Sequence, residues 1–176
     1  MLNIKNKNII LKFQIFSFIF VSILGTLLHF TYEWSNNNQF VAIFSAINES
    51  TWEHLKLIFF PMLITTIIGY FYIGKTVPNF LCAKTLGLII SILFTVIFFY
   101  TYTGILGTNI DFINISVFFL TVLLGEYTAY RIMVSNLNCN KKISFFVLFT
   151  LLICFIFFTY FPPKIGLFKA PIISNK

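Results

Sequence analysis

Two short segments of the chain hold both of its histidines and most of its carboxylates. His29 and Glu33 are four residues apart, and Glu49, Glu53 and His54 follow after a short polar stretch. Imidazoles and carboxylates at this density can bind a divalent cation, relay protons or act as a general acid and base. The spacing does not match the His-Glu-x-x-His zinc motif. The residue types therefore indicate a site for a polar ligand, and they leave the reaction and any metal or cofactor undetermined.

The elements that carry these residues are apolar runs long enough to cross a membrane. Five such runs occupy residues 13–32, 57–74, 85–110, 113–133 and 143–161. A spanning helix needs about 20 mostly apolar residues. Only 10% of the chain is charged, whereas soluble domains carry about 25%. We therefore predict an all-α fold in one domain: an integral membrane bundle of about five transmembrane helices, with the lipid bilayer around it.

The charges between the runs predict how the bundle is oriented. Eight Lys and Arg residues lie before the first run, between the second and third runs, or from the end of the fourth run (Arg131) to the start of the fifth; Lys56 is the only one in the alternate loops. The positive-inside rule then places the N-terminus in the cytoplasm. With five spans the C-terminus is external. Its Lys164, Lys169 and Lys176 run against the rule, and a re-entrant fifth run is the alternative.

Composition also excludes some functions. The net charge of +7 does not indicate nucleic-acid binding, because the lysines are scattered among short loops and form no stripe with interleaved aromatic residues. Cys82, Cys139 and Cys154 show neither a Cys-x-x-Cys motif nor Cys/His zinc spacing. We expect three unpaired thiols.

Residues 48–56, at the start of the second run, have two interpretations. In the first, Ser50 and Glu53 form a capping box, and Lys56 neutralises Glu49 and Glu53 on the same helical face. In the second, the external ends of the first two helices bring all five His and Glu candidates to one membrane level. They would then form an outward-facing site for a small polar ligand, an ion or a lipid head group.

Glu126 is a carboxylate inside an apolar run. At about 1.5 Å per residue from Ile113 it lies about 20 Å below the external surface. Tyr130 shares its helical face, and Arg131 can reach the cytoplasmic interface. Ionisable groups within a span are costly and are candidates for function. We expect Glu126 to be protonated, or paired with Arg or Lys, and to fix helix packing, although no basic residue is adjacent on its own face. A proton or cation relay is the alternative.

Several strings in the chain resemble a family of small bacterial multipass membrane proteins of unknown function. They are residues 28–34, residues 125–127, the double proline at 162–163 with residues 167–168, and the most specific string, Asn48-Glu49-Ser50-Thr51-Trp52-Glu53-His54-Leu55-Lys56. The resemblance spans most of the chain. It implies a bacterial cytoplasmic membrane and no established activity, substrate or cofactor.

The sequence leaves three classes of function open. The primary hypothesis is a membrane protein with the outward-facing His/Glu site. The rival is a non-catalytic structural or accessory protein whose polar residues only lock helix packing. The third is an intramembrane enzyme acting on lipid or peptide.

Overall fold

Five long helices make up the fold, which is seen in a computed structural model that describes residues 4–137 and 139–171. They are α1 (Ile4–Trp34), α2 (Thr51–Gly69), α3 (Phe80–Leu106), α4 (Asp111–Met133) and α5 (Lys141–Tyr160). Two short segments lie between them: the 3₁₀ turn η1 (Val41–Ile43) and the π-turn η2 (Tyr70–Gly74). A further 3₁₀ turn, η3 (Gly166–Phe168), follows α5. All five helices are long and apolar enough to cross a membrane. The predicted all-α bundle is therefore confirmed.

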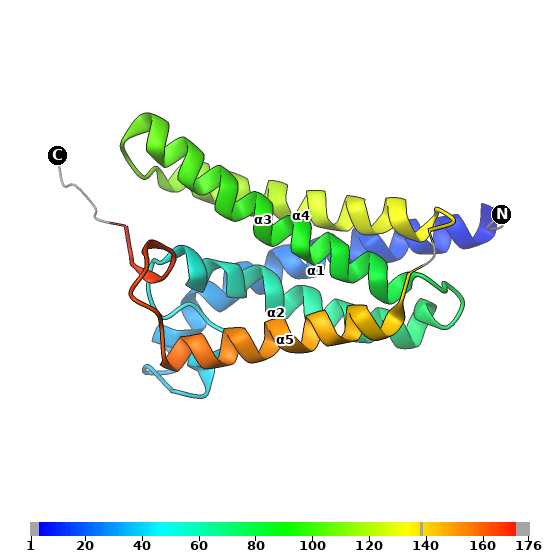
Figure 1. The fold of residues 1–176 in the computed structure, drawn as a ribbon, viewed down its shortest axis with the longest axis horizontal. Coiled ribbons are helices and arrows are strands. Elements are labelled where there is room, and N and C mark those ends of the chain that lie inside the picture. Colours follow the sequence, from blue (N-terminus) through cyan, green and yellow to red (C-terminus); the bar gives the residue numbers. More distant parts are fainter. Residues whose placement is uncertain (1–3, 138, 172–176) are drawn as a thin grey trace.

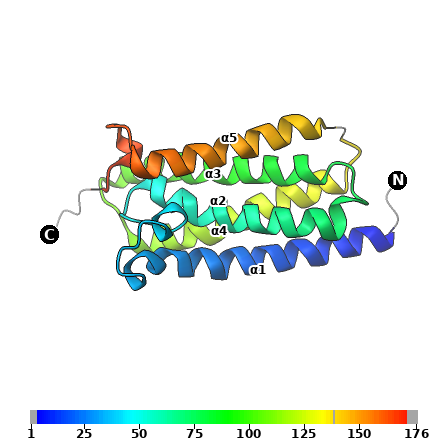
Figure 2. The ribbon, with the colours of Figure 1, turned by 90° about the horizontal axis from the view of Figure 1, so that it is seen from below.

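The connections gather at two ends of the bundle (Figures 1 and 2). The start of α1, the α2–α3 turn and the α4–α5 loop lie at one end, called here the N-terminal end. The α1–α2 loop, the α3–α4 turn and residues 161–171 lie at the other, called the loop end. The 20 residues of α5 run from one end to the other without turning back, unlike the re-entrant alternative. Lys176 lies outside the described residues.

Apolar side chains fill the bundle and also cover its outside. The largest buried cluster draws on α1 to α5 and includes Phe59, Met62, Leu88, Val122 and Phe155. Many large apolar side chains are nevertheless exposed on every helix. Extensive exposed apolar surface marks contact with a membrane or a partner, and a surface of this kind suits a multipass membrane protein.

Small residues bring α3 and α4 close together. A Cβ atom at Gly87 would collide with the carbonyl oxygen of Gly125. Beside this contact, Ser91 donates a hydrogen bond to the Thr121 carbonyl at 3.2 Å, and Thr95 donates to the Thr121 hydroxyl at 3.2 Å. The polar and small stripe of the third apolar run therefore packs one helix against the next, as small residues do within membranes.

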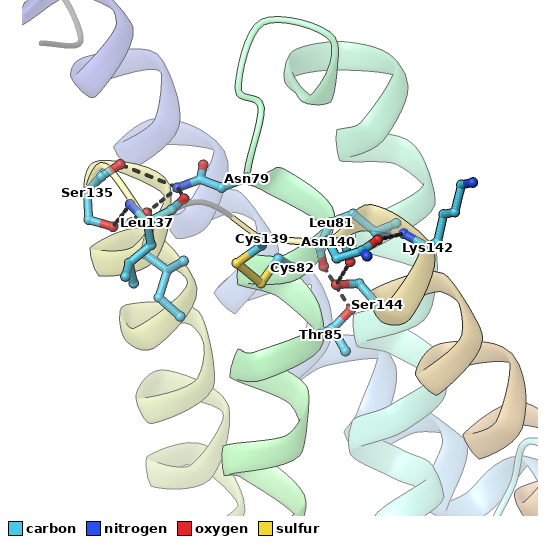
Figure 3. The surroundings of a disulfide bond; sticks show 11 residues. Asn79, Leu81, Cys82, Thr85, Ser135, Leu137, Cys139, Asn140, Lys142 and Ser144 are labelled. Atoms are coloured by element: carbon cyan, nitrogen blue, oxygen red, sulfur yellow. Dashed lines mark hydrogen bonds between the residues drawn. A yellow bond between two sulfur atoms is a disulfide. The ribbon is translucent and has the colours of Figure 1, made fainter.

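Cys82 and Cys139 form a disulfide at the N-terminal end, with their Cα atoms 6.0 Å apart (Figure 3). The prediction of three unpaired thiols is therefore wrong for this pair, whereas Cys154 is a free thiol. The two half-cystines are 57 residues apart in sequence, so no local cysteine spacing could have predicted the bond. Next to it, Asn79 donates to the Ile132 carbonyl at 2.6 Å and caps the end of α4.

Candidate functional site

Ser50 caps the start of α2 and orients His54, which lies one turn later. The Ser50 side chain accepts a hydrogen bond from the Glu53 N–H at 3.4 Å, as an N-cap does. Its carbonyl lies 2.9 Å from Nδ1 of His54. A carbonyl only accepts hydrogen bonds, so Nδ1 carries a proton, and in the neutral imidazole Nε2 then has the free lone pair that a metal needs. That Nε2 lies 3.5 Å from Oε2 of Glu49, in the loop just before α2.

His29 on α1 completes a group of three possible ligands. Its ring centroid is 5.2 Å from that of His54. One ligand atom from each of His29, Glu49 and His54 lies within 4.8 Å of the other two. In a tetrahedral zinc site with bonds of about 2.0–2.1 Å, ligand atoms are about 3.4 Å apart. The Glu49–His54 pair already has about this spacing, at 3.5 Å. Bringing in the third ligand shortens separations of up to 4.8 Å by up to about 1.4 Å.

The Nδ1 atom of His29 is buried and has no hydrogen-bond partner among the described residues. An unsatisfied buried polar group of this kind destabilises a fold by about 1–3 kcal/mol. The loop end therefore holds a polar atom whose hydrogen-bonding capacity a bound ligand can satisfy.

Ser45 ties the α1–α2 loop to α1 beside His29. Its buried hydroxyl accepts a hydrogen bond from the Tyr32 N–H at 2.9 Å and donates one to the Leu28 carbonyl. These two backbone groups are one helical turn apart on α1. The loop that carries Glu49 is thus held against the turn that carries His29, which keeps the two ligands together.

Glu53 has a different role from Glu49. Its carboxylate lies 2.6 Å from Nζ of Lys56, and both side chains are buried. Lys56 also donates to the Ala42 carbonyl at 2.7 Å and to the Thr159 hydroxyl at 3.2 Å, and Glu53 accepts from the Ile47 N–H at 2.9 Å. The pair therefore fastens the α1–α2 loop and α5 to the start of α2. Lys56 neutralises one of the two nearby carboxylates rather than both.

Glu33 lies one turn beyond His29 and is exposed. It lines a pocket of about 210 Å³ together with Tyr32, Asn48 and two of the possible ligands, His29 and Glu49. Among the described residues, Glu33 and Glu53 fall outside the group of three that lies within ligand distance. The structure thus places three of the five sequence candidates around one opening. His54 lies next to two of them, His29 and Glu49, and the fifth candidate, Glu53, is engaged in an ion pair.

Glu126 is not isolated: a lysine of another helix pairs with it, which is one of the two states expected for it. Lys84 on α3 places Nζ 2.7 Å from both carboxylate oxygens, and Ser17 on α1 donates to Oε1 at 2.7 Å. All three side chains are buried. The sequence places Lys84 in a loop, because the third apolar run is predicted to begin at residue 85. The helix begins at Phe80, and the apolar residues 80–83 were the signal that could have revealed this.

Tyr130 and Arg131 do not take part in the Glu126 network. Tyr130 is half-buried against the cluster formed by Ile10, Phe13 and their neighbours. Arg131 is exposed and donates to the Tyr127 hydroxyl at 2.8 Å, with its guanidinium 5.8 Å from that ring. These contacts suit residues at the edge of a membrane, where aromatic and basic side chains gather.

Comparison with known proteins supplies a family and no activity. No curated protein and no solved structure matches the chain. The sequence profile of DUF6512, a family of unknown function, matches residues 2–175. Since this match covers nearly the whole chain, the protein belongs to DUF6512.

Proposed function

We propose that the protein binds a divalent transition-metal ion at the loop end, through His29, Glu49 and His54. The observation that carries this proposal is the convergence of three ligand atoms within 4.8 Å from α1, the loop and α2. Two imidazoles and one carboxylate form zinc sites that keep a further position open for water or substrate. The hydrogen bond from His54 to Ser50 is the kind of outer contact that fixes a metal-binding imidazole.

The open position gives the ion a role beyond structure. The adjoining pocket of about 210 Å³ is lined partly by Glu33 and Asn48, so a small polar molecule or a lipid head group that reaches the metal meets further polar groups. A metal ion polarises an oxygen that it binds. The site would therefore bind a small ligand or a lipid head group through one of its oxygen atoms, which the metal would polarise.

We further propose that the protein sits in a bacterial cytoplasmic membrane with its N-terminus inside. The resemblance to small bacterial membrane proteins motivates the choice of membrane, and the distribution of Lys and Arg motivates the orientation. Among the side chains that the structure describes, the exposed cations of the N-terminal end are Lys7, Lys12, Lys75, Arg131, Lys141 and Lys142. In this orientation the metal site and the described C-terminal segment face outward.

A second function, that of an accessory protein without a ligand, has its own observation in favour. The buried pairs Glu53–Lys56 and Glu126–Lys84 each join several helices or loops. In that case the contact between His29 and His54 would also serve packing alone.

Metal binding by the purified full chain separates the two functions. We expect the wild type to bind one Zn²⁺ and to melt at a higher temperature with it. Loss of even an outer contact weakens metal sites by about 10–100-fold, so His54→Gln should weaken zinc binding at least as much. Glu33→Gln is the matched control, because it removes a carboxylate from the same pocket but outside the group of three. If Zn²⁺, Co²⁺ and Ni²⁺ do not change the melting temperature of the wild type, only the accessory function remains.

A further inference from the structure

A second and larger opening lies between α1 and α2 towards the N-terminal end, away from the candidate metal site. It has a volume of about 500 Å³ and is lined by Ile9, Lys12, Phe13, Phe16, Ile68 and Tyr72. Apart from the Lys12 ammonium and the Tyr72 hydroxyl, these side chains offer only hydrocarbon or aromatic surface. We call this opening the α1–α2 groove.

The sequence of α2 shapes this groove. Gly69 lets Phe13 pack directly against the α2 backbone, since a Cβ atom at Gly69 would collide with the rings of Phe13 and Phe80. Beyond Gly69 the helix widens into the π-turn η2, which carries Tyr72 on its outer side with 72% of its surface exposed. π-turns within helices occur frequently at functional sites. The groove is therefore a feature of the backbone and not only a gap between side chains.

Among the described residues, the cation in the groove has no carboxylate to pair with. The chain contains five acidic residues. Glu126 accepts from Lys84, and the other four lie at the loop end: Glu33, Glu49, Glu53 and Asp111. Along α1, Glu33 is about 30 Å from Lys12 at 1.5 Å per residue. An anion that neutralises Lys12 therefore comes from outside the described part of the chain.

The position of Lys12 selects the kind of anion. Phe13 packs on Gly69, so Lys12 stands about 9 Å along α2 from Lys75, at 1.5 Å per residue. At this depth a lysine lays its methylene stem along apolar surface and extends its ammonium to the head-group region. Basic side chains near a membrane surface attract anionic lipids. A free phosphate ion would satisfy the ammonium but leave the apolar walls exposed.

We propose that the α1–α2 groove binds one anionic phospholipid, with an acyl chain against Phe16, Ile68 and Tyr72 and the phosphate at Lys12. This site is independent of the metal proposal, because it lies at the opposite end and shares no residue with it. It also does not depend on which compartment the N-terminus faces.

Lipid retention by the full chain tests the site. The protein is extracted from membranes containing phosphatidylglycerol and phosphatidylcholine, and bound lipid is counted by native mass spectrometry. We compare the wild type with Lys12→Gln and with Lys7→Gln. Lys7 is exposed on the same helix and lies outside the groove, so the two variants lose equal charge. One juxtamembrane lysine accounts for about a five-fold change in binding, and we expect that loss in Lys12→Gln only.

A second variant tests the acyl-chain part of the proposal. Ile68→Trp leaves the charge unchanged and fills the groove, so it should displace the phosphatidylglycerol while Lys12 is still present. Inorganic phosphate, added to protein in phosphatidylcholine alone, should not raise the melting temperature. Equal losses in Lys7→Gln and Lys12→Gln would overturn the proposal in favour of diffuse surface attraction. Full lipid retention by Ile68→Trp, or stabilisation by phosphate, would overturn it as well.

Discussion

The Lys84 ammonium on α3 donates to both carboxylate oxygens of Glu126 on α4, each at 2.7 Å. Ser17 on α1 contacts both partners, at 3.0 Å from Nζ and 2.7 Å from Oε1. Moving two charges out of water is unfavourable by several kcal/mol per ion, and only close, well-satisfied geometry offsets it. The pair therefore holds three helices together at one point.

This ion pair determines how the protein should respond to Glu126→Gln. A lone buried carboxyl group would be protonated and would tolerate the change to an amide. With Lys84 opposite, Glu126→Gln leaves an ammonium buried without its counter-ion, which should lower the free energy of unfolding by about 3–5 kcal/mol. Thermal unfolding of the detergent-solubilised protein measures this. The double variant Lys84→Met/Glu126→Gln should recover part of the loss. If Glu126→Gln is as stable as the wild type, the Lys84–Glu126 pair carries no net charges and is not an ion pair.

Glu53 and Glu49 should respond in opposite ways to the same substitution. Glu53→Gln breaks the buried pair with Lys56 and should lower the melting temperature, yet leave the rise caused by Zn²⁺ intact. The Glu49 side chain is 59% exposed, and exposed ion pairs contribute only about 0–1 kcal/mol. Glu49→Gln should therefore keep the basal melting temperature and lose the zinc response. Loss of that response in Glu53→Gln would place Glu53 among the ligands.

Two glycines provide a matched test of the α3–α4 packing. A Cβ atom at Gly125 would collide with the Ser91 hydroxyl, whereas one at Gly104 meets nothing within 4 Å. Gly104→Ala should be neutral or stabilise the helix by up to about 1 kcal/mol, because alanine is the better helix former. Gly125→Ala should destabilise by about 1–3 kcal/mol through overpacking. Thermal melts that fall equally for both variants would contradict the close approach seen here.

The sequence predicts those features that depend on local pattern. The fourth helix was expected at 113–133 and extends over Asp111–Met133, because polar residues bound it at both ends. The start of α2 follows from the capping residue Ser50. In both cases the signal lies within a few residues of the feature it predicts.

Features that depend on contacts between helices could not be predicted from the sequence. Lys84 resembles a loop lysine in sequence, and its partner Glu126 is 42 residues away. The alternation of spans predicts that His29 and His54 lie at one end of the bundle. It does not show which glutamate joins them, because Glu49 and Glu53 are four residues apart and would share one face of a helix. The fold of the loop, fixed through Ser45, decides which of the two meets the histidines.

Single cysteines, placed in a variant without native cysteines, test the proposed orientation. Gln39 and Thr108 are exposed at the loop end, and Thr76 and Asn136 are exposed at the N-terminal end. A membrane-impermeant maleimide should label the first two in intact cells and the last two only after permeabilisation. Asn79 is unsuitable because its side chain is buried and caps α4. Labelling of position 76 in intact cells would reverse the orientation.

Cys82 and Cys139 test the same orientation without any engineered cysteine. Their Cα atoms are 6.0 Å apart, a separation that a disulfide spans without backbone movement. Cytosolic thiols are kept reduced, whereas disulfides persist in oxidising compartments. The structure shows the bonded form of this pair. If the N-terminal end faces the cytoplasm, the bond should be reduced in the cell, so acid-quenched cells should yield both thiols free. The bond should then form when isolated membranes meet a thiol oxidant such as diamide. Maleimide mass tags added before and after reduction count the thiols, and Cys82→Ser gives the pattern of a chain that cannot form this bond. A bond already present in quenched cells would place the N-terminal end on the oxidising side and overturn the orientation, while leaving the fold unchanged.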